Sequence, residues 1–368
     1  MKMFATIITV ASFIIVLAHV GVYFSWLKFF QITDPGFRRW LAIGLFVLSI
    51  SFVIGSMLVH RYEHGIAAAI YLISSIWLGA FLYILMSVIL TWIGGGISAL
   101  ISGSAHWRPI ATGFLTIAVG FSLWGLWSAA NPKITEITVP IRNLPASWEG
   151  RKIAQISDVH LGAINRTEFM RHIVEEINGV NPDMVVITGD LFDGVGDDLK
   201  SLVSPLAALH PKLGTYFITG NHETYHGVEA CIAALDGLPI KTLRNDIIDI
   251  DGVQLLGIEF PTREQRLALE PVLQKLSPDK PAIVLFHMPS GMDLFKKYGV
   301  DLVLCGHTHV GQMWPFNYIT HRVYHGYDYG LKTDGDFSIY TNSGAGSWGP
   351  PYRTNVRPEV AVVTVVGK

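Results

Sequence analysis

The segment Lys152-Ile-Ala-Gln-Ile-Ser-Asp-Val-His160 joins a short apolar run to an acidic residue and a histidine. Short runs rich in β-branched residues predict strands, and the run Met184-Val-Val-Ile-Thr188 is followed in the same way by Gly189 and Asp190. Similar runs alternate with helical patterns through the rest of the chain, which is typical of an α/β fold. Further strands are expected at 215–219, 253–258, 282–286 and 301–305, and helices at about 167–178, 198–209, 228–235 and 264–276.

Polar residues follow nearly every predicted strand. Because open α/β sheets build their sites beyond the carboxyl ends of strands, we expect these side chains to converge. Oxygen and imidazole ligands together suit Mn, Fe or Zn better than Ca or Cu(I). The residues at these strand ends are Asp158 and His160, Asp190 and Asp193, Asn221 and His222, His287, and His307 and His309.

The number of candidate ligands exceeds what one ion can take, so the pattern predicts two divalent ions that share a carboxylate. Asp158 and His160 are one residue apart and so share a face of extended backbone, and His307 and His309 repeat this spacing. A single histidine of this kind is more often a structural hydrogen-bonding residue than a ligand. The recurrence of polar clusters at successive strand ends favours the metal interpretation.

These clusters resemble the motif series of the calcineurin-like metallophosphoesterase superfamily, which reads DxH, GDxxD, GNH followed by D or E, a lone H, and GHxH. The series is complete here, from Asp158-Val-His160 to Gly306-His-Thr-His309, and it covers about residue 152 to the C-terminus. The stretches 306–312 and 343–359 are similar to the membrane-anchored subgroup that includes the YkuE and YaeI types and the transmembrane metallophosphoesterases. Val310 stands where a second glycine is common, and no effect on metal binding is expected.

The resemblance implies a four-layer α/β/β/α sandwich and a hydrolase of phosphomonoesters, phosphodiesters or pyrophosphates. A hydroxide held between the two ions would attack phosphorus in line, so no protein nucleophile is needed. His222 would protonate or stabilise the leaving oxygen. Asp193 would either orient His222 or a ligand, or cap its own loop, and both alternatives are open. The implied ligands are Asp158, His160, Asp190 and His309 for the first ion, and Asp190, Asn221, His287 and His307 for the second.

The N-terminal part of the chain has a different composition. Residues 1–130 carry eight of the 56 charged side chains. Four stretches in this part contain no Asp, Glu, Lys or Arg, and each is near the length of about 20 residues that crosses a membrane as a helix. The first stretch is much longer than the apolar core of a signal peptide, so we expect it to be retained. The predicted spans are 3–27, 40–59, 67–93 and 110–129, followed by a linker with a short strand at 131–150 and the metallophosphoesterase domain at 151–368.

An even number of spans places the N-terminus and the C-terminal domain on the same side of the membrane. The overall positive-inside count is a tie, but Lys28, Arg38 and Arg39 outnumber Lys2 around the first helix. This favours an extracytoplasmic domain on an integral protein of the plasma membrane. The expected partners are membrane lipids and a phosphoester substrate, such as a lipid head group.

Two other functions compete with the hydrolase. The first is a metal or phosphate sensor without activity, and the second is a transporter with a regulatory domain. His19 lies within the first span, where an interhelical hydrogen bond is the expected role, and His60 and His64 are expected to be solvated rather than to bind metal. The formal charge of −2 gives no indication of nucleic-acid binding.

Several features are left open by the sequence. They are the natural substrate, the preference for monoesters or diesters, the metal and the oligomeric state. Cys231 lies in a predicted helix and Cys305 in a predicted strand, so no disulfide is inferred. Candidates for a rim that recognises the rest of the substrate are Tyr225, His226, His325, Tyr327, Trp348, Tyr352 and Arg353, and most of them suit ordinary aromatic packing equally well.

Overall fold

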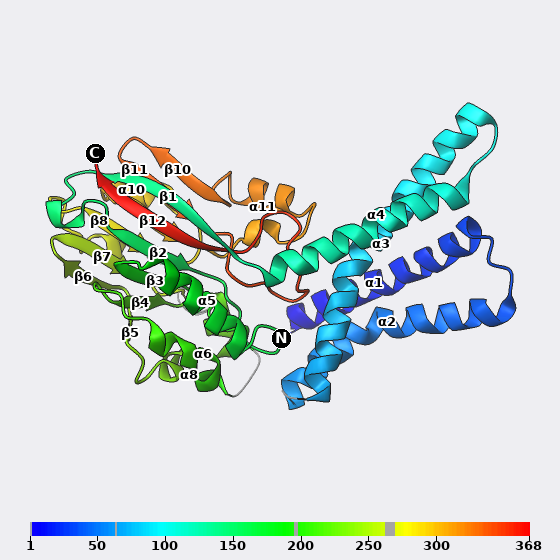
Figure 1. The fold of residues 1–368 in the computed structure, drawn as a ribbon, viewed down its shortest axis with the longest axis horizontal. Helices are drawn as coiled ribbons and strands as arrows, with labels where there is room; N and C mark the ends of the chain where they lie inside the picture. The colour runs from blue at the N-terminus through cyan, green and yellow to red at the C-terminus, as the bar shows by residue number, and fades with distance from the viewer. Residues whose placement is uncertain (1, 63–64, 195–197, 262–268) are drawn as a thin grey trace. The chain divides into compact units, whose positions relative to one another are not determined.

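The computed structural model describes residues 2–62, 65–194, 198–261 and 269–368 (Figure 1). The chain divides into two compact units. Unit 1 comprises residues 1–127 with 349–352, and unit 2 comprises residues 128–348 with 353–368.

Four long apolar helices account for nearly all of unit 1, and each is long and apolar enough to cross a membrane. In lipid a backbone must satisfy its own hydrogen bonds, which explains why these stretches are helical despite their glycines. The helices are α1 (Lys2–Phe29), α2 (Pro35–Tyr62), α3 (Ile66–Ser102) and α4 (Trp107–Ala130).

Helix α3 has 37 residues and extends well past the predicted end at residue 93. It continues through Gly94, Gly95 and Gly96, and the indole of Trp107 lies where a Cβ of Gly95 would be. The helix ends where Gly103 takes a left-handed conformation and its N–H donates to the carbonyl of Ala99. Gly94 and Gly95 thus serve helix packing, whereas Gly103 ends the helix.

His19 makes the interhelical hydrogen bond that the sequence predicts. Its Nε2 accepts a hydrogen bond from Nε1 of Trp77 in α3 at 3.0 Å, and its Nδ1 lies 2.8 Å from the carbonyl of Ile15. The ring of Phe81 stacks on the imidazole at 3.5 Å between centroids. His60 contacts the carbonyl of Ser56 through Nδ1, whereas His64 lies outside the described residues.

Unit 2 contains two six-stranded sheets. Their orders are β1-β12-β2-β3-β4-β5 and β10-β11-β9-β8-β7-β6. The strands are β1 (Lys133–Ile141), β2 (Lys152–Ile156), β3 (Met184–Thr188), β4 (Thr215–Ile218), β5 (Ile240–Thr242), β6 (Asp246–Ile250), β7 (Val253–Gly257), β8 (Ala282–Leu285), β9 (Leu302–Cys305), β10 (Gly330–Asp334), β11 (Phe337–Thr341) and β12 (Glu359–Gly367). The helices are α5 (Thr167–Val180), α6 (Leu199–Val203), α7 (Asn221–His226), α8 (Val228–Ala234), α9 (Leu269–Leu273), α10 (Met292–Lys297) and α11 (Asn317–Val323).

Alternation along the strands divides the core of unit 2 into three layers of side chains. In β2, Ile153 faces the second sheet, whereas Ala154 and Ile156 face the outer helices. Three helices, α5, α6 and α8, cover the first sheet, and α9 and α10 cover the second. The two sheets therefore pack between two layers of helices, and the predicted α/β/β/α sandwich is confirmed.

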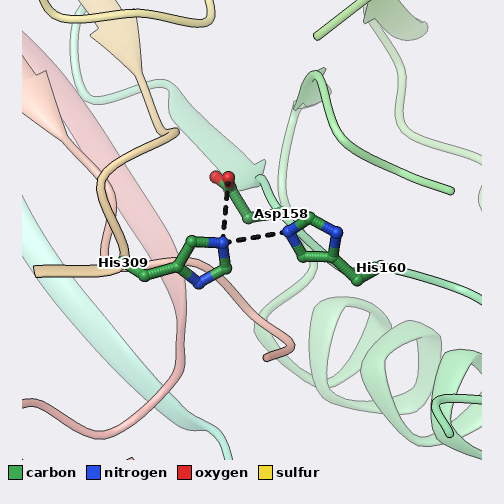
Figure 2. Close-up of side chains that lie close together, drawn as sticks. All are labelled: Asp158, His160 and His309. Atoms are coloured by element: carbon green, nitrogen blue, oxygen red, sulfur yellow. Dashed lines mark hydrogen bonds and ion pairs between the residues drawn. The ribbon is translucent and has the colours of Figure 1, made fainter. Parts of the chain in front are cut away.

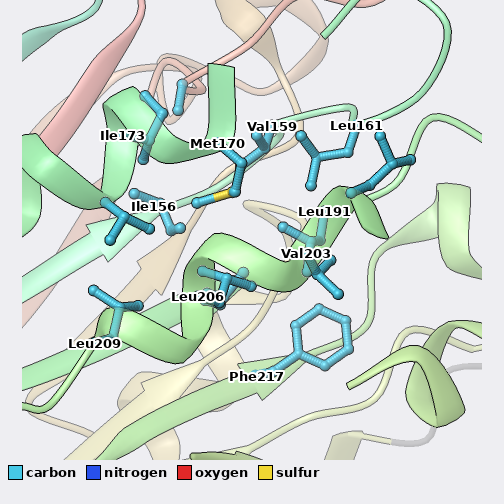
Figure 3. Packing of buried hydrophobic residues seen from close by; sticks show 14 of the residues in the cluster. Ile156, Val159, Leu161, Met170, Ile173, Leu191, Val203, Leu206, Leu209 and Phe217 are labelled. Carbon is cyan, nitrogen blue, oxygen red and sulfur yellow. The ribbon is translucent and has the colours of Figure 1, made fainter. Parts of the chain in front are cut away.

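The packing of α5 shows how the sequence produces this arrangement. Met170, Ile173, Val174 and Ile177 recur at helical spacing, so one face of α5 is apolar and buried. They pack with Ile156 and Phe217 of the first sheet in a single cluster (Figure 3).

The predicted helix at 198–209 is divided into α6 and a 3-10 helix at Ser204–Ala208. Pro205 lies at the start of the 3-10 helix and has no backbone N–H with which to continue the hydrogen bonds of α6.

The strand expected after the last apolar helix has nine residues and lies at the edge of the first sheet. Two residues, Asn131 and Pro132, separate α4 from β1. Strand β1 pairs in parallel with β12, and β12 is antiparallel to β2. The beginning of β1 therefore lies at the same end of the sheet as the carboxyl end of β2.

Of the helix predicted at 264–276, the structure describes α9, while residues 262–268 lie outside the described part.

Candidate metal centre

The polar residues that follow the strands of unit 2 meet at one site. Asp158 and His160 follow β2, Asp190 and Asp193 follow β3, and Asn221 and His222 begin α7 after β4. His287 follows β8 of the second sheet, and His307 and His309 follow β9. The structure thus brings together all nine residues that the sequence singles out, at the edge where strands of both sheets end.

The backbone at this site is strained. Residues with a side chain rarely adopt positive φ, and each such position costs on the order of 1–3 kcal/mol. The turns are held by hydrogen bonds between neighbouring loops, such as Asp158 N–H to the carbonyl of Gly189 at 3.0 Å and His160 N–H to that of Asp190 at 3.1 Å. The candidate ligands with φ between 48° and 77° are Asp158, His160, Asp190, His307 and His309.

The first group of ligand atoms comes from Asp158, His160 and His309 (Figure 2). Nε2 of His309 lies 2.9 Å from Nε2 of His160 and 3.4 Å from Oδ1 of Asp158. All three residues are buried. Two imidazole nitrogens and a carboxylate oxygen converge on one point, which is a donor set suited to a divalent cation.

The second group comes from Asp190, His287 and His307. Nε2 of His287 lies 3.2 Å from Oδ2 of Asp190, 3.2 Å from Nδ1 of His307 and 3.2 Å from Oδ1 of Asn221. Oδ2 of Asp190 is also 4.0 Å from Nε2 of His160 in the first group. The carboxylate of Asp190 therefore lies between the two groups.

Asp193 contacts two histidines of the site. Its Oδ1 lies 3.5 Å from Nδ1 of His160 and 3.7 Å from Nδ1 of His222, and its backbone carbonyl is 3.1 Å from Nδ1 of His222. Among the two roles left open by the sequence, these contacts favour orienting the rings over capping the loop. His222 is also fixed through its backbone N–H, which donates to Oδ1 of Asp190 at 2.8 Å.

The electrostatics of the cluster fit bound cations. Burial opposes charge on His287, but the carboxylate of Asp190 raises the pKa of His287 to about 10. Burial and then the charge of His287 lower the pKa of His307 to about 4. Burial and then Arg353 hold the pKa of His309 well below its usual value. The carboxylates thus attract positive charge, while His307 and His309 offer neutral nitrogens, the form that binds metal.

Glu223 is a structural residue of the site whose role the sequence analysis does not identify. Its carboxylate is fully buried and accepts hydrogen bonds from the backbone N–H groups of Asp190 at 2.9 Å, Phe192 at 3.1 Å and Gly220 at 2.6 Å. Burial, and then the charge of Asp190, raise the pKa of Glu223 to about 7. The sequence does contain a signal for this role, because Glu223 directly follows His222 as the acidic residue of the third motif.

Replacing Glu223 with Ala is expected to lower the free energy of unfolding by about 3–5 kcal/mol, because three buried backbone donors lose their acceptor. Thermal unfolding of the purified full chain measures this loss. Glu175→Ala on the exposed face of α5 is the control and is expected to have little effect. Equal melting temperatures for the two variants would show that the Glu223 network does not support the loop.

The structure corrects part of the predicted rim. Arg353 is fully buried and donates to the carbonyl of His309 at 3.0 Å, while its Nη2 lies 2.8 Å from Nδ1 of His309. The rim position is therefore wrong for Arg353, while Tyr352 is buried, which agrees with the alternative of ordinary aromatic packing. Tyr225 and Trp348 are 64% and 58% exposed, and their ring centroids lie 5.5 and 6.0 Å from that of His222. These two aromatic residues flank the site.

The two cysteines take no part in the site. Both are buried and free, and Cys305 packs in the cluster between the second sheet and its helices, as the sequence predicts. Burial, and then the charge of Asp158, hold the pKa of the Cys305 thiol well above its ordinary value. A thiolate ligand from this residue is therefore disfavoured.

Comparison with known proteins agrees with this geometry. A family model described as calcineurin-like phosphoesterase matches residues 151–311. An uncharacterized metallophosphoesterase of Helicobacter pylori is 36% identical over 263 residues, which cover 70% of each chain. A transmembrane protein with metallophosphoesterase domain from Danio rerio is 31% identical over 284 residues, 73% of this chain and 64% of its own. The uncharacterized metallophosphoesterase YkuE of Bacillus subtilis is 29% identical over 266 residues, which cover 70% of this chain and 93% of its own.

Proposed function

Because this chain belongs to the calcineurin-like phosphoesterase family, we propose that it is a membrane-anchored hydrolase of phosphomonoesters, phosphodiesters or pyrophosphates. The observation that carries the proposal is the pair of buried histidine and aspartate groups with the carboxylate of Asp190 between them. A sensor without activity would not need to keep every ligand of both groups. The apolar helices support the membrane anchor.

We assign two divalent ions to the site. Imidazole and carboxylate donors favour Mn, Fe or Zn. The spacing of the ligand atoms supports the assignment, since each group of three lies within 4.8 Å. The proposed ligands are Asp158, His160, Asp190 and His309 for one ion, and Asp190, Asn221, His287 and His307 for the other.

When bound, such ions supply an activated water and neutralise the charge of the phosphate. The chain's own residues then position the substrate and move a proton. His222 is held at Nδ1 by the carbonyl of Asp193, which leaves Nε2 as the nitrogen for the leaving oxygen. In the proposed reaction His222 is protonated at both ring nitrogens and gives the proton on Nε2 to that oxygen, and Asp193 fixes the orientation of the ring.

The test is phosphoesterase activity of the purified full chain after metal removal and resupply with Mn²⁺, Mg²⁺ or Zn²⁺. Bis-p-nitrophenyl phosphate and p-nitrophenyl phosphate report diesterase and monoesterase activity. His222→Ala is expected to lower turnover about 10²–10⁴-fold while the metal content stays unchanged, because general acid catalysis is lost. His172→Ala, an exposed histidine of α5, is the matched control.

Three outcomes would count against the proposal. Full activity of His222→Ala would remove its assigned role. Two bound ions without turnover of any phosphoester would favour the sensor. A chain that binds no metal would overturn the metal centre itself.

We further propose that residues 1–130 hold the chain in the plasma membrane and that residues 131–150, which include β1, lead into the catalytic domain at 151–368. The positive charges around the first helix favour an extracytoplasmic site. A protease added to intact cells would then digest the catalytic domain. The proposed substrate lies at the membrane, and a phosphorylated lipid head group suits an anchored enzyme.

A further inference from the structure

One segment of unit 2 exposes an unusual number of large apolar side chains. Among the described residues of unit 2, seven large hydrophobic residues are exposed, and five of them lie between residues 314 and 323. Helix α11 has no buried residue, and Tyr318 and Ile319 are 67% and 59% exposed. A concentrated apolar surface of this kind marks an interaction site. We call it the α11 surface; it consists of Trp314, Phe316, Tyr318, Ile319 and Val323.

The α11 surface adjoins the metal centre. Its segment follows His309 after a single 3-10 turn, and the ring of Tyr324 lies 6.0 Å from that of His307. Gln312 joins this segment to Trp348, since its side chain accepts from the N–H of Trp348 at 2.9 Å and donates to its carbonyl at 2.8 Å. The two other exposed hydrophobic residues, Tyr225 and Trp348, flank His222.

The chain enters unit 2 at this same edge. Ala130 ends α4 and Lys133 begins β1, so about 11 Å of extended chain at most separates their Cα atoms. Lys133 pairs with Glu359, at the edge where β2 leads into the first ligands. Arg357 fixes this entry point by donating to the carbonyl of Asn131 at 2.7 Å. Within unit 2, α11 and the beginning of β1 lie toward the same end (Figure 1).

The charge of the segment suits a bilayer surface. The stretch 314–325 contains Arg322 and two histidines but no Asp or Glu. His321 is paired with the carboxylate of Asp328 at 3.0 Å, whereas Arg322 is exposed in the last turn of α11. Aromatic residues beside a cationic group are typical of segments that rest at the headgroup level, and anionic lipids attract the cation.

We propose that the α11 surface docks on the bilayer that holds the apolar helices of this chain. The metal centre then opens toward phosphoesters carried by lipids at the bilayer surface. The docking stands on the exposed residues and the chain entry, whereas the choice of substrate rests on the proposed function. The exposed rings of Tyr225 and Trp348 contact the part of the lipid next to the phosphate.

The docking is tested on the full chain in nanodiscs of phosphatidylcholine and phosphatidylglycerol. Ile319→Cys carries an environment-sensitive fluorophore, and the natural thiols of Cys231 and Cys305 are buried, so labelling of the unmodified chain gives the background. Lipids with a spin label near the headgroup are expected to quench the fluorophore at position 319. Asp279→Cys is the matched control. Asp279 is exposed and precedes β8, so it lies at the end of the strand opposite to the candidate ligand His287, and a fluorophore there is expected to remain unquenched.

Activity tests the substrate class separately. Ile319→Asp is expected to lower kcat/KM about tenfold for diacylglycerol p-nitrophenyl phosphate in the bilayer, because apolar contact with lipid is lost. Turnover of soluble bis-p-nitrophenyl phosphate is expected to be unchanged, since Ile319 is 59% exposed and is not one of the candidate metal ligands. Equal loss on both substrates would overturn the docking.

The outcomes separate the two proposals. A fluorophore at 319 that no lipid quenches overturns the docking even if soluble diesters are hydrolysed. A shielded fluorophore without quenching by lipid would assign the surface to a protein partner or a second copy and would also overturn it. Quenching at 319 with no turnover of any phosphoester would leave the docking intact and refute the proposed function.

Discussion

Replacing Asp190 with Asn is expected to lower phosphoester turnover about 10³-fold or more and to reduce the number of bound ions. The carboxylate lies between the two groups of ligand atoms, 3.2 Å from His287 and 4.0 Å from His160. A neutral amide removes the negative charge that both ions would share. The loss of several kcal/mol of charge stabilisation corresponds to about three powers of ten in rate.

The number of bound ions and the turnover rate are measured on the same preparations of Asp190→Asn, so that loss of metal and loss of activity can be compared directly. Asp236→Asn, at an exposed position after α8, removes a carboxylate of the same kind far from the ligands and is expected to retain both ions and full activity. Two tightly bound ions in Asp190→Asn would show that this carboxylate is not the shared ligand. A large loss of activity without loss of metal would assign Asp190 to the substrate instead.

The second large effect is expected at Arg353. This guanidinium is fully buried, and its hydrogen bonds join His309 to the loop at Gly346. Burial lowers the pKa of Arg353 to about 10 even though Asp158 and Glu359 act in the opposite direction, so the group stays charged at neutral pH. Arg353→Met keeps much of the volume but leaves buried carbonyls without donors, at an expected cost of about 3–5 kcal/mol in the free energy of unfolding.

That cost corresponds to a fall in melting temperature on the order of 10 °C for a domain of this size. Metal affinity is expected to fall about 10–100-fold as well, because the residue holding the ring of His309 is gone. Isothermal titration with Mn²⁺ measures this second effect. Arg166→Met is the control at an exposed position before α5. An unchanged affinity would limit Arg353 to a purely structural role.

The residues at the metal centre were predictable because their signal is local. The strands β2, β3, β4, β8 and β9 are short apolar runs, and the candidate ligands come shortly after them. The expectation that Asp158 and His160 share a face of extended backbone was wrong, because both take positive φ after β2 ends and the turn brings them to the site. Every ligand candidate therefore appears in the sequence as part of a strand with its following turn, and the structure brings these turns to one edge.

Other parts of the fold depend on contacts that are distant in the sequence. Strand β12 lies between β1 and β2, so the end of the chain completes a sheet that begins more than 200 residues earlier, as the pairing of Lys133 with Glu359 shows. Strands β6 and β10 have mixed or exposed burial patterns and so lack a clear apolar alternation. Helix α3 runs on through three glycines, and the packing of Trp107 against Gly95 is not indicated by any local pattern.

The buried position of Arg353 could not be predicted for a related reason. An arginine near the C-terminus is most often solvated, and in the sequence it is separated from His309 by 44 residues. Its burial depends on backbone carbonyls of the 309 and 346 turns, which point toward it only after the fold has formed. This cation therefore has no surface exposed to a substrate, whereas Trp348 is 58% exposed.

The two residues between α4 and β1 also have a consequence for how the enzyme meets its substrate. On the proposed membrane anchor, so short a connection keeps unit 2 within reach of the bilayer. For a substrate that is itself a lipid, encounters then arise from lateral diffusion in two dimensions. The supply of substrate is set by its mole fraction in the membrane, and the volume of the surrounding solution has no influence on it.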